Sequence, residues 1–73
     1  MNVSSDNTGS ETRYGKIISV RGSVVDVAYE NNLPSIFALL RTGVGNKVFI
    51  EVLSQLDSNS VRGIALNPTQ GLS

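Results

Sequence analysis

Residues 15–29 read GKIISVRGSVVDVAY, and this stretch decides the fold. Side chains of an extended strand alternate between two faces, so the apolar positions indicate which face is buried. The apolar face consists of Ile18 and Val20 before Gly22, and of Val25, Val27 and Tyr29 after it. The apolar set therefore moves from even to odd positions, which requires an extra residue or a bend. Gly22 is the natural place for this bulge or sharp corner, of the kind that curls a sheet into a barrel.

The opposite face of the same stretch carries Asp26 and, just beyond it, Glu30. Two carboxylates on one face could form the acid and base pair of a hydrolase. Four residues of extended strand separate them by about 13 Å, whereas glycoside hydrolysis needs roughly 5–9.5 Å between such groups. We therefore interpret both as solvated residues of the polar face.

The whole chain has 73 residues, which allows one domain at most. Its apolar residues include nine Val and five Ile, against seven Leu and three Ala. β-branched side chains fit pleated, half-buried surfaces better than helices. Hydrophobic residues make up 40% of the chain and charged residues 16%, which is typical of a folded domain. The composition therefore predicts an all-β fold.

The charge balance and the missing residue types exclude several classes of function. Six Lys and Arg balance six Asp and Glu, so the chain lacks the basic excess of most nucleic-acid-binding proteins. It contains no Cys and no His, which excludes disulfides, thiol nucleophiles, His-dependent catalytic triads and the commonest zinc ligands. No apolar run approaches the roughly 20 residues of a membrane span, so we expect no direct membrane insertion. The chain is therefore not expected to be an enzyme on its own.

The first thirteen residues differ in composition from the rest. They contain only Met1 and Val3 as apolar members, among Asn, Ser, Thr, Asp and Gly. Such a segment cannot bury enough surface to offset the entropy of ordering it. We expect a disordered tail over residues 1–13 and a barrel domain over residues 14–73.

Turn residues divide the second half of the chain. Asn31 and Asn32 supply turn chemistry, and Pro34 excludes a central strand close by. The apolar run at 36–40 is too short to classify by its period, and it fits either a buried strand or one helical turn.

A hairpin is predicted further along. Within residues 47–56, the alternation of Val48, Ile50 and Val52 competes with a helical spacing, and the β-branched content favours a strand. The turn cluster at 57–60 leads to a second strand over 61–66, so the pair reads as a β-hairpin with a four-residue connection.

Residues 43–47 read GVGNK and resemble a phosphate-binding loop only superficially. That loop needs four residues between its glycines and a helix after its lysine, and neither condition is met. We interpret Gly43 and Gly45, like Gly22, as structural turn or bulge residues. We expect no catalytic, cofactor-binding or metal-binding residue in the chain.

Three arginines, Arg21, Arg41 and Arg62, lie on separate segments and could converge on one rim of a small barrel. Modules that bind oligonucleotides also stack bases on aromatic side chains. Phe37 and Phe49 lie in apolar runs, and we expect both in the core. A free-standing barrel that binds nucleic acid or a peptide is the alternative interpretation, and no nucleic-acid partner is expected.

Five segments together carry a resemblance to a known family. They are GKIISVRGSVVDV at 15–27, NLPSI at 32–36, VFIEVLSQL at 48–56, NSVRGIAL at 59–66 and TQGL at 69–72. In order and spacing they resemble the start of the β subunit of rotary F-type ATP synthases, over nearly everything outside the tail. The run GSVVDV and the Leu-Pro step resemble the β subunit more than the related α subunit.

The resemblance has two departures from the common pattern. Ser35 stands where many members of the family have a second proline, which leaves the local chain path open. Residues 61–66 and 68–72 are similar to the variant, sodium-linked F-type enzymes of some prokaryotes, although another subunit sets the coupling ion.

The resemblance implies a fold and a role. In this family the segment is a closed six-stranded β-barrel before the nucleotide-binding domain. Three β and three α barrels alternate in a ring, the crown, which holds the hexamer together during ATP synthesis or hydrolysis coupled to ion transport.

The resemblance also implies partners and a location. The expected partners are α subunits, in a complex peripheral to the cytoplasmic face of a prokaryotic inner membrane. ATP and magnesium would bind in a later domain, so no cofactor is expected in residues 1–73, and the native reading frame is expected to continue beyond Ser73.

Overall fold

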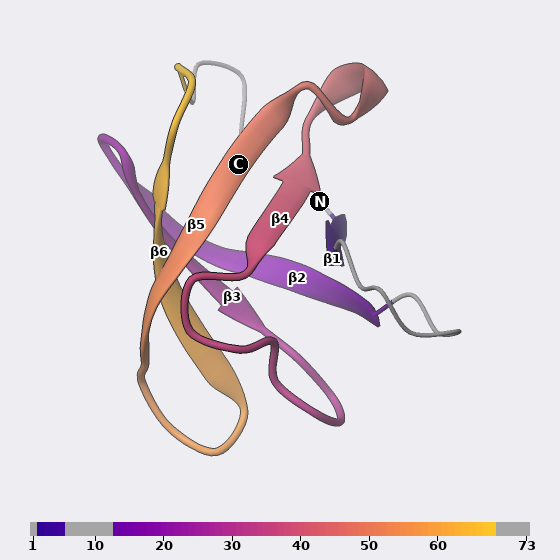
Figure 1. Cartoon of the computed structure of the whole chain (residues 1–73), viewed down its shortest axis with the longest axis vertical. Coiled ribbons are helices and arrows are strands. Elements are labelled where there is room, and N and C mark those ends of the chain that lie inside the picture. The colour runs from indigo at the N-terminus through magenta and orange to yellow at the C-terminus, as the bar shows by residue number, and fades with distance from the viewer. Residues whose placement is uncertain (1, 6–12, 69–73) are drawn as a thin grey trace.

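The computed structural model describes residues 2–5 and 13–68, and nearly all regular structure in this part of the chain is β-strand (Figure 1). Its elements are β1 (Asn2–Ser5), β2 (Arg13–Arg21), β3 (Val24–Ala28), β4 (Leu39–Thr42), the 3-10 helix η1 (Val44–Asn46), β5 (Val48–Gln55) and β6 (Ser60–Ala65). The prediction of an all-β fold is therefore confirmed.

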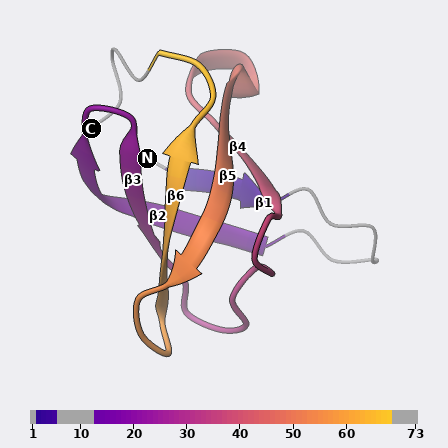
Figure 2. The same cartoon turned by 60° about the vertical axis from the view of Figure 1, so that its left-hand side comes forward.

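The strands form one strongly curled antiparallel sheet in the order β1-β2-β3-β6-β5-β4 (Figure 2). Two ladders join strands that do not follow one another in the chain. The β3–β6 seam has five residue pairs, from Val24↔Ile64 to Ala28↔Ser60. The β1–β4 seam has two, Ser4↔Arg41 and Ser5↔Leu40, and through it the strand order returns to β1.

The bulge of the decisive stretch lies at Ile18 and not at Gly22. The β2–β3 register shifts between Ile17 and Ser19, so Ile18 is the extra residue of β2. Ile17 is consequently buried, while Ile18 is 56% exposed. The prediction that Ile18 faces the core is therefore wrong, because the parity changes four residues earlier than the glycine suggests.

Gly22 instead forms the turn of the β2–β3 hairpin. Arg21 pairs with Val24, so the connection has two residues, and Gly22 has a φ of 58°. A two-residue hairpin of this kind needs positive φ, which glycine adopts without a steric penalty. β2 and β3 are thus separate strands rather than one strand with a corner.

The interior of the curled sheet is filled mainly by β-branched side chains. Its buried members are Ile17, Val25, Val27, Tyr29, Leu40, Ile50, Val52 and Val61, and Val20 packs against them half-buried. The predicted inward face of Val25, Val27 and Tyr29 is therefore confirmed. The ring of Tyr29 lies over Gly15, where a Cβ atom would approach it to 2.7 Å.

The predicted hairpin over 47–66 is confirmed as β5 and β6. Ile50 and Val52 are fully buried, as strand alternation requires. In the connection, the Asp57 carboxylate accepts hydrogen bonds from the Asn59 N–H at 2.7 Å and the Ser60 hydroxyl at 2.9 Å. Polar side chains that bond to their own backbone favour such turns.

The ambiguous run at 36–40 becomes a turn followed by the start of β4. The Ala38 N–H donates to the Ser35 carbonyl at 3.0 Å, which closes a β-turn. Phe37 lies in this turn and is 72% exposed, so its predicted place in the core is wrong. Phe49, on β5, is half-buried.

The prediction of a disordered tail over 1–13 is wrong at residues 2–5 and at Arg13, which lie in strands. Asn2–Ser5 forms β1 and pairs with β2, which itself begins at Arg13. Pairing with a neighbouring strand supplies backbone hydrogen bonds that do not depend on apolar side chains. Residues 6–12 lie outside the described part of the chain.

Candidate interaction surface of the curled sheet

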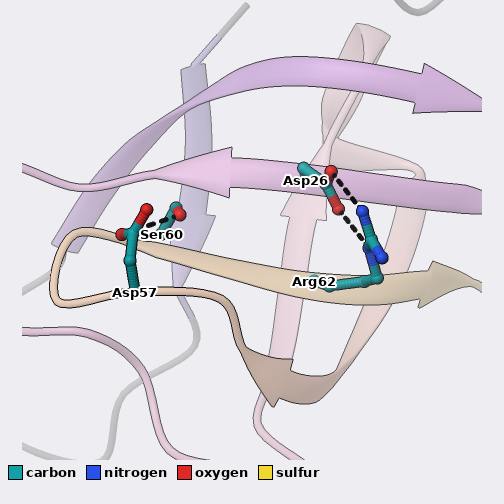
Figure 3. A network of polar contacts seen from close by, with 4 residues as sticks. All are labelled: Asp26, Asp57, Ser60 and Arg62. Carbon is teal, nitrogen blue, oxygen red and sulfur yellow. Dashed lines mark hydrogen bonds and ion pairs between the residues drawn. The ribbon is translucent and has the colours of Figure 1, made fainter.

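An ion pair fixes the outer face of the β3–β6 seam (Figure 3). Asp26 and Arg62 stand opposite each other in the ladder, 36 positions apart in the chain. The Arg62 Nε donates to Asp26 Oδ1 at 2.8 Å and Nη2 donates to Oδ2 at 3.0 Å. This bidentate geometry is the strongest form of an arginine–carboxylate contact. The ion pair therefore connects β3 and β6, two strands that are neighbours in the sheet but distant in the sequence.

The environment of Asp26 determines its protonation. The residue is only 6% exposed, so it is not the solvated polar-face residue that alternation predicts. The hydrogen bonds from Arg62 hold the pKa of Asp26 below its ordinary value of 3.8, against the opposing effect of burial, and the charges of Arg62 and Arg21 add to the lowering. The same contact raises the pKa of Arg62. Both groups stay charged at neutral pH, so we interpret the pair as a structural salt bridge between β3 and β6 rather than as an acid or base.

A second carboxylate is held in the β5–β6 turn. Hydrogen bonds from the Asn59 N–H and then from the Ser60 hydroxyl lower the pKa of Asp57. Ser60 is buried at the start of β6, and Asp57 lies beside it (Figure 3). Asn59 belongs to the turn and Ser60 is the first residue of β6, so this carboxylate shapes the connection.

The three arginines are placed on three strands, β2, β4 and β6. Arg62 is engaged by Asp26, and Arg21 contributes to the field around that carboxylate. The Arg41 guanidinium lies 5.7 Å from the centroid of the Phe49 ring, directly across the β4–β5 ladder. These contacts favour stacking and pairing within the sheet over one shared basic rim.

Of the other two predicted turn residues, one precedes η1 and the other lies within it. Gly43 precedes this element with a φ of 79°, and Gly45 lies within it with a φ of 68°. No group of three or more Asp, Glu, His or Cys side chains that could hold a metal ion occurs within residues 2–5 and 13–68. A membrane-spanning helix needs a long apolar segment, and the described part of the chain has no helix of that kind.

Three exposed apolar residues lie on β5 or in the turn that is hydrogen-bonded to it. Phe37 is 72% exposed, and Ile36 and Leu53 are each 45% exposed. The Phe37 N–H donates to the Val52 carbonyl at 2.7 Å, which places the turn against β5 next to Leu53. We name Ile36, Phe37 and Leu53 the β5 patch.

A hollow adjoins this patch. It has a volume of about 490 Å³, and Ile36 belongs both to its wall and to the β5 patch. The wall consists of Asn31, Asn32, Leu33, Pro34, Ser35, Ile36, Gln55 and Ser58. Because this wall carries no ionisable group, the hollow suits a packing contact better than acid–base chemistry.

Sequence reasoning missed both features of this surface. The signal for the ion pair was a single charged residue, Asp26, in the middle of a Val-rich run, where an unpaired carboxylate would be costly. Its partner could not be read from the chain, because the pairing of β3 with β6 depends on the topology. No pattern in the sequence marked Phe37 as exposed.

Comparison with known proteins assigns the fold to a family. Residues 17–73 match the model of the beta-barrel domain of the ATP synthase alpha/beta family. The chain is 51% identical over 67 residues to ATP synthase subunit beta 2 of Chlorobium luteolum, with 92% of this chain and 14% of the relative covered. It is 59% identical over 63 residues to ATP synthase subunit beta 1 of a Marinomonas species, with 80% and 13% covered.

The match is extensive in this chain and short in its relatives. The chain spans only about one seventh of the length of these beta subunits. More than half of the chain agrees with one family model, and the strands of the structure are those of a barrel sheet. The chain therefore belongs to the ATP synthase alpha/beta family, as the N-terminal barrel of an F-type beta subunit.

Proposed function

We propose that this chain is the assembly module of a beta subunit, which holds alternating alpha and beta subunits together in a ring. The ring keeps its shape while ATP is made or hydrolysed in a reaction coupled to ion transport. The observation that carries this proposal is the match of residues 17–73 to the barrel domain of the alpha/beta family.

The proposal includes a closed six-stranded barrel over the domain at 14–73, with β1 as its sixth strand. The cyclic order of the ladders supports closure, because β1 pairs with β2 on one side and with β4 on the other. A closed sheet has no free edge, so the surface that remains for a partner is the outer wall and the two ends.

The proposal assigns the chemistry to another part of the full-length subunit. ATP and magnesium would bind in a domain after residue 73, since the relatives are about seven times longer than this chain. The barrel supplies contacts only, and a near-neutral module with a formal charge of +0 suits that task.

The proposed partners and location are supported by the names of the relatives, which are bacterial ATP synthase subunits. The proposed partners are alpha subunits, and the proposed location is a peripheral complex on the cytoplasmic face of the inner membrane. Contacts between unlike faces of neighbours generate a ring when the rotation closes. A small barrel also gains stability from a partner that covers part of its wall.

The test uses the full-length subunit co-expressed with its alpha partner, and native mass spectrometry measures the complex. The informative variant is Gly63→Ala, since a Cβ at Gly63 would lie 2.6 Å from the Glu51 carbonyl oxygen inside the sheet. We expect this variant to lose the mixed complex while nucleotide binding by the rest of the subunit persists. The control is Val44→Ala, which changes a side chain that is 91% exposed and should assemble normally.

Two results would contradict the proposal. One is a wild-type subunit that forms no mixed complex with alpha. The other is a Gly63→Ala subunit that still assembles with alpha as the wild type does, although limited proteolysis shows that its barrel is unfolded.

A further inference from the structure

The turn at 35–38 holds one residue in a backbone conformation that its side chain disfavours. The Ala38 N–H donates to the Ser35 carbonyl at 3.0 Å, and Phe37, the third residue of the turn, has a φ of 70°. A β-turn with positive φ only at its third position is of type II, which prefers glycine or asparagine there. Among the described residues, Phe37 is the only non-glycine residue with positive φ. The turn therefore carries a cost in free energy that a glycine would avoid.

A type I turn would remove this cost and keep the same closing hydrogen bond. The two turn types differ mainly by a half-rotation of the central peptide, which here joins Ile36 to Phe37. In type I the third residue has a negative φ, which suits phenylalanine, and the N–H of the fourth residue still bonds to the carbonyl of the first. The bond from Ala38 to Ser35 therefore does not discriminate between the two orientations of the central peptide.

A hydrogen bond to β5 opposes the rotation. The Phe37 N–H, which belongs to the central peptide, donates to the Val52 carbonyl at 2.7 Å. A half-rotation would point this N–H away from β5 and break the bond. The bond from the Val52 N–H to the Ala38 carbonyl, at 3.0 Å, does not involve the central peptide. The contribution of one backbone hydrogen bond and the cost of a positive φ in phenylalanine are of the same order, so the two orientations are close in free energy.

The packing around the turn adds little to the preference for either orientation. Ile36 and Phe37 are both exposed, so the core holds neither side chain in place. The register of β5 with β6 shifts between Val52 and Ser54, which makes the strand irregular beside the turn. Ser35 and Ile36 also form part of the wall of the hollow of about 490 Å³. A rotation of the central peptide would therefore change the shape of this hollow.

We propose that the peptide between Ile36 and Phe37 is a conformational switch with two positions. In one it is bonded to the Val52 carbonyl in a type II turn, and in the other it is released from β5 in a type I turn. The hollow changes shape with the switch, so a molecule that fits the hollow in only one position would shift the balance toward that position. The switch is a property of this chain and does not depend on assembly with alpha subunits.

Amide hydrogen exchange of the full-length subunit tests the switch, because the amide at position 37 is bonded in one position and released in the other. Relative to its free-peptide rate, this amide should exchange at least about tenfold faster than the Val52 amide in the wild type. Phe37→Gly favours the type II turn and should bring the two amides within about threefold of each other. Phe37→Ala removes the ring but keeps the disfavoured φ, so this matched control should exchange as the wild type does.

Three results would overturn the proposal. One is an amide at position 37 that is protected as strongly as the Val52 amide in the wild type. Another is equal exchange at position 37 in the wild type, Phe37→Gly and Phe37→Ala, which would indicate ordinary fraying of the turn. The third is an unfolding temperature of Phe37→Gly below that of Phe37→Ala, because alanine is the less favourable of the two at a positive φ.

Discussion

The β3–β6 seam and the β1–β4 seam both join strands that are distant in the chain, yet they are built very differently. The β3–β6 seam has five residue pairs, a bidentate ion pair on its outer face and buried Val25, Val27 and Val61 beneath it. The β1–β4 seam has two residue pairs. Figure 2 shows β6 running along the length of β3 and β1 as a short arrow beside β4.

The difference between the two seams indicates which part of the sheet contributes most to its stability. Each backbone hydrogen bond contributes modestly, and buried apolar area contributes most. A seam with a long ladder over a packed interior should open only with global unfolding, whereas a seam of two pairs can open locally. We therefore expect the sheet to be most stable along β3 and β6 and to open first between β1 and β4.

The largest loss of stability is expected from removing a buried side chain next to the β3–β6 seam. Ile17, Val27 and Val61 form one row across β2, β3 and β6. We expect Ile17→Ala to lower the free energy of unfolding by about 3 kcal/mol, because it leaves a cavity in this row. Ile18→Ala, at the exposed bulge next door, should change it by less than about 0.5 kcal/mol. Urea denaturation measures both, and equal effects would contradict the placement of the bulge.

The second effect is expected from overfilling the space between β6 and β5. Gly63 faces Val25 on β3, and a Cβ there would meet Ile50 and the Glu51 backbone at 2.6 Å. We expect Gly63→Ala to destabilise the fold by about 2–3 kcal/mol, since a backbone atom cannot turn away as a side chain can. A thermal unfolding curve of Gly63→Ala that overlays the wild type would show that β5 and β6 lie further apart than described.

A smaller effect is expected from the ion pair. Asp26→Asn keeps the shape but removes the charge, and water reaches the Arg62 side chain, which is 38% exposed. We therefore expect a loss of about 1–2 kcal/mol at pH 7. Because folding lowers the pKa of Asp26, the stability it provides is present above the unfolded value of 3.8 and is lost as the pH falls through the folded value.

The pH dependence sharpens this test. The difference between the wild type and Asp26→Asn should be constant near neutrality and should shrink as the pH falls below about 4. The pKa of Asp57 is also lowered, but Asp57 is present in both proteins, so its contribution cancels in the difference. A difference that persists unchanged at pH 2 would indicate a role in packing and not an ion pair.

Much of the fold could be predicted from local patterns. The alternation of Val25, Val27 and Tyr29 and the hairpin of β5 and β6 follow from side-chain parity and turn chemistry, which are properties of short segments. The bulge at Ile18 could not be placed, because either of two adjacent isoleucines can face inward until a neighbouring strand fixes the register. β1 could not be predicted from its composition. Its pairing with β2 and β4 depends on backbone hydrogen bonds, which the side chains of this segment do not indicate.

The candidate surface was less accessible to sequence reasoning than the fold. Asp26 looks solvated on a polar face, and only the packing of β6 against β3 supplies Arg62 and buries it. Phe37 looks like a core residue in an apolar run, and only the turn geometry shows it exposed at a positive φ. Both depend on contacts between segments that local patterns do not report.

The most direct test of whether the curled sheet closes as proposed, with a strong β3–β6 seam and a weak β1–β4 seam, is residue-resolved hydrogen–deuterium exchange of the full-length subunit. The account predicts that the amides of Val25, Val27 and Val61 exchange last and together, while those of β1 and β4 at their shared seam are also protected but exchange earlier. Amides of β1 that exchange as fast as free peptide would show that the sixth strand is not part of the barrel. Amides of β3 and β6 that exchange before β1 would show that the fold is held elsewhere.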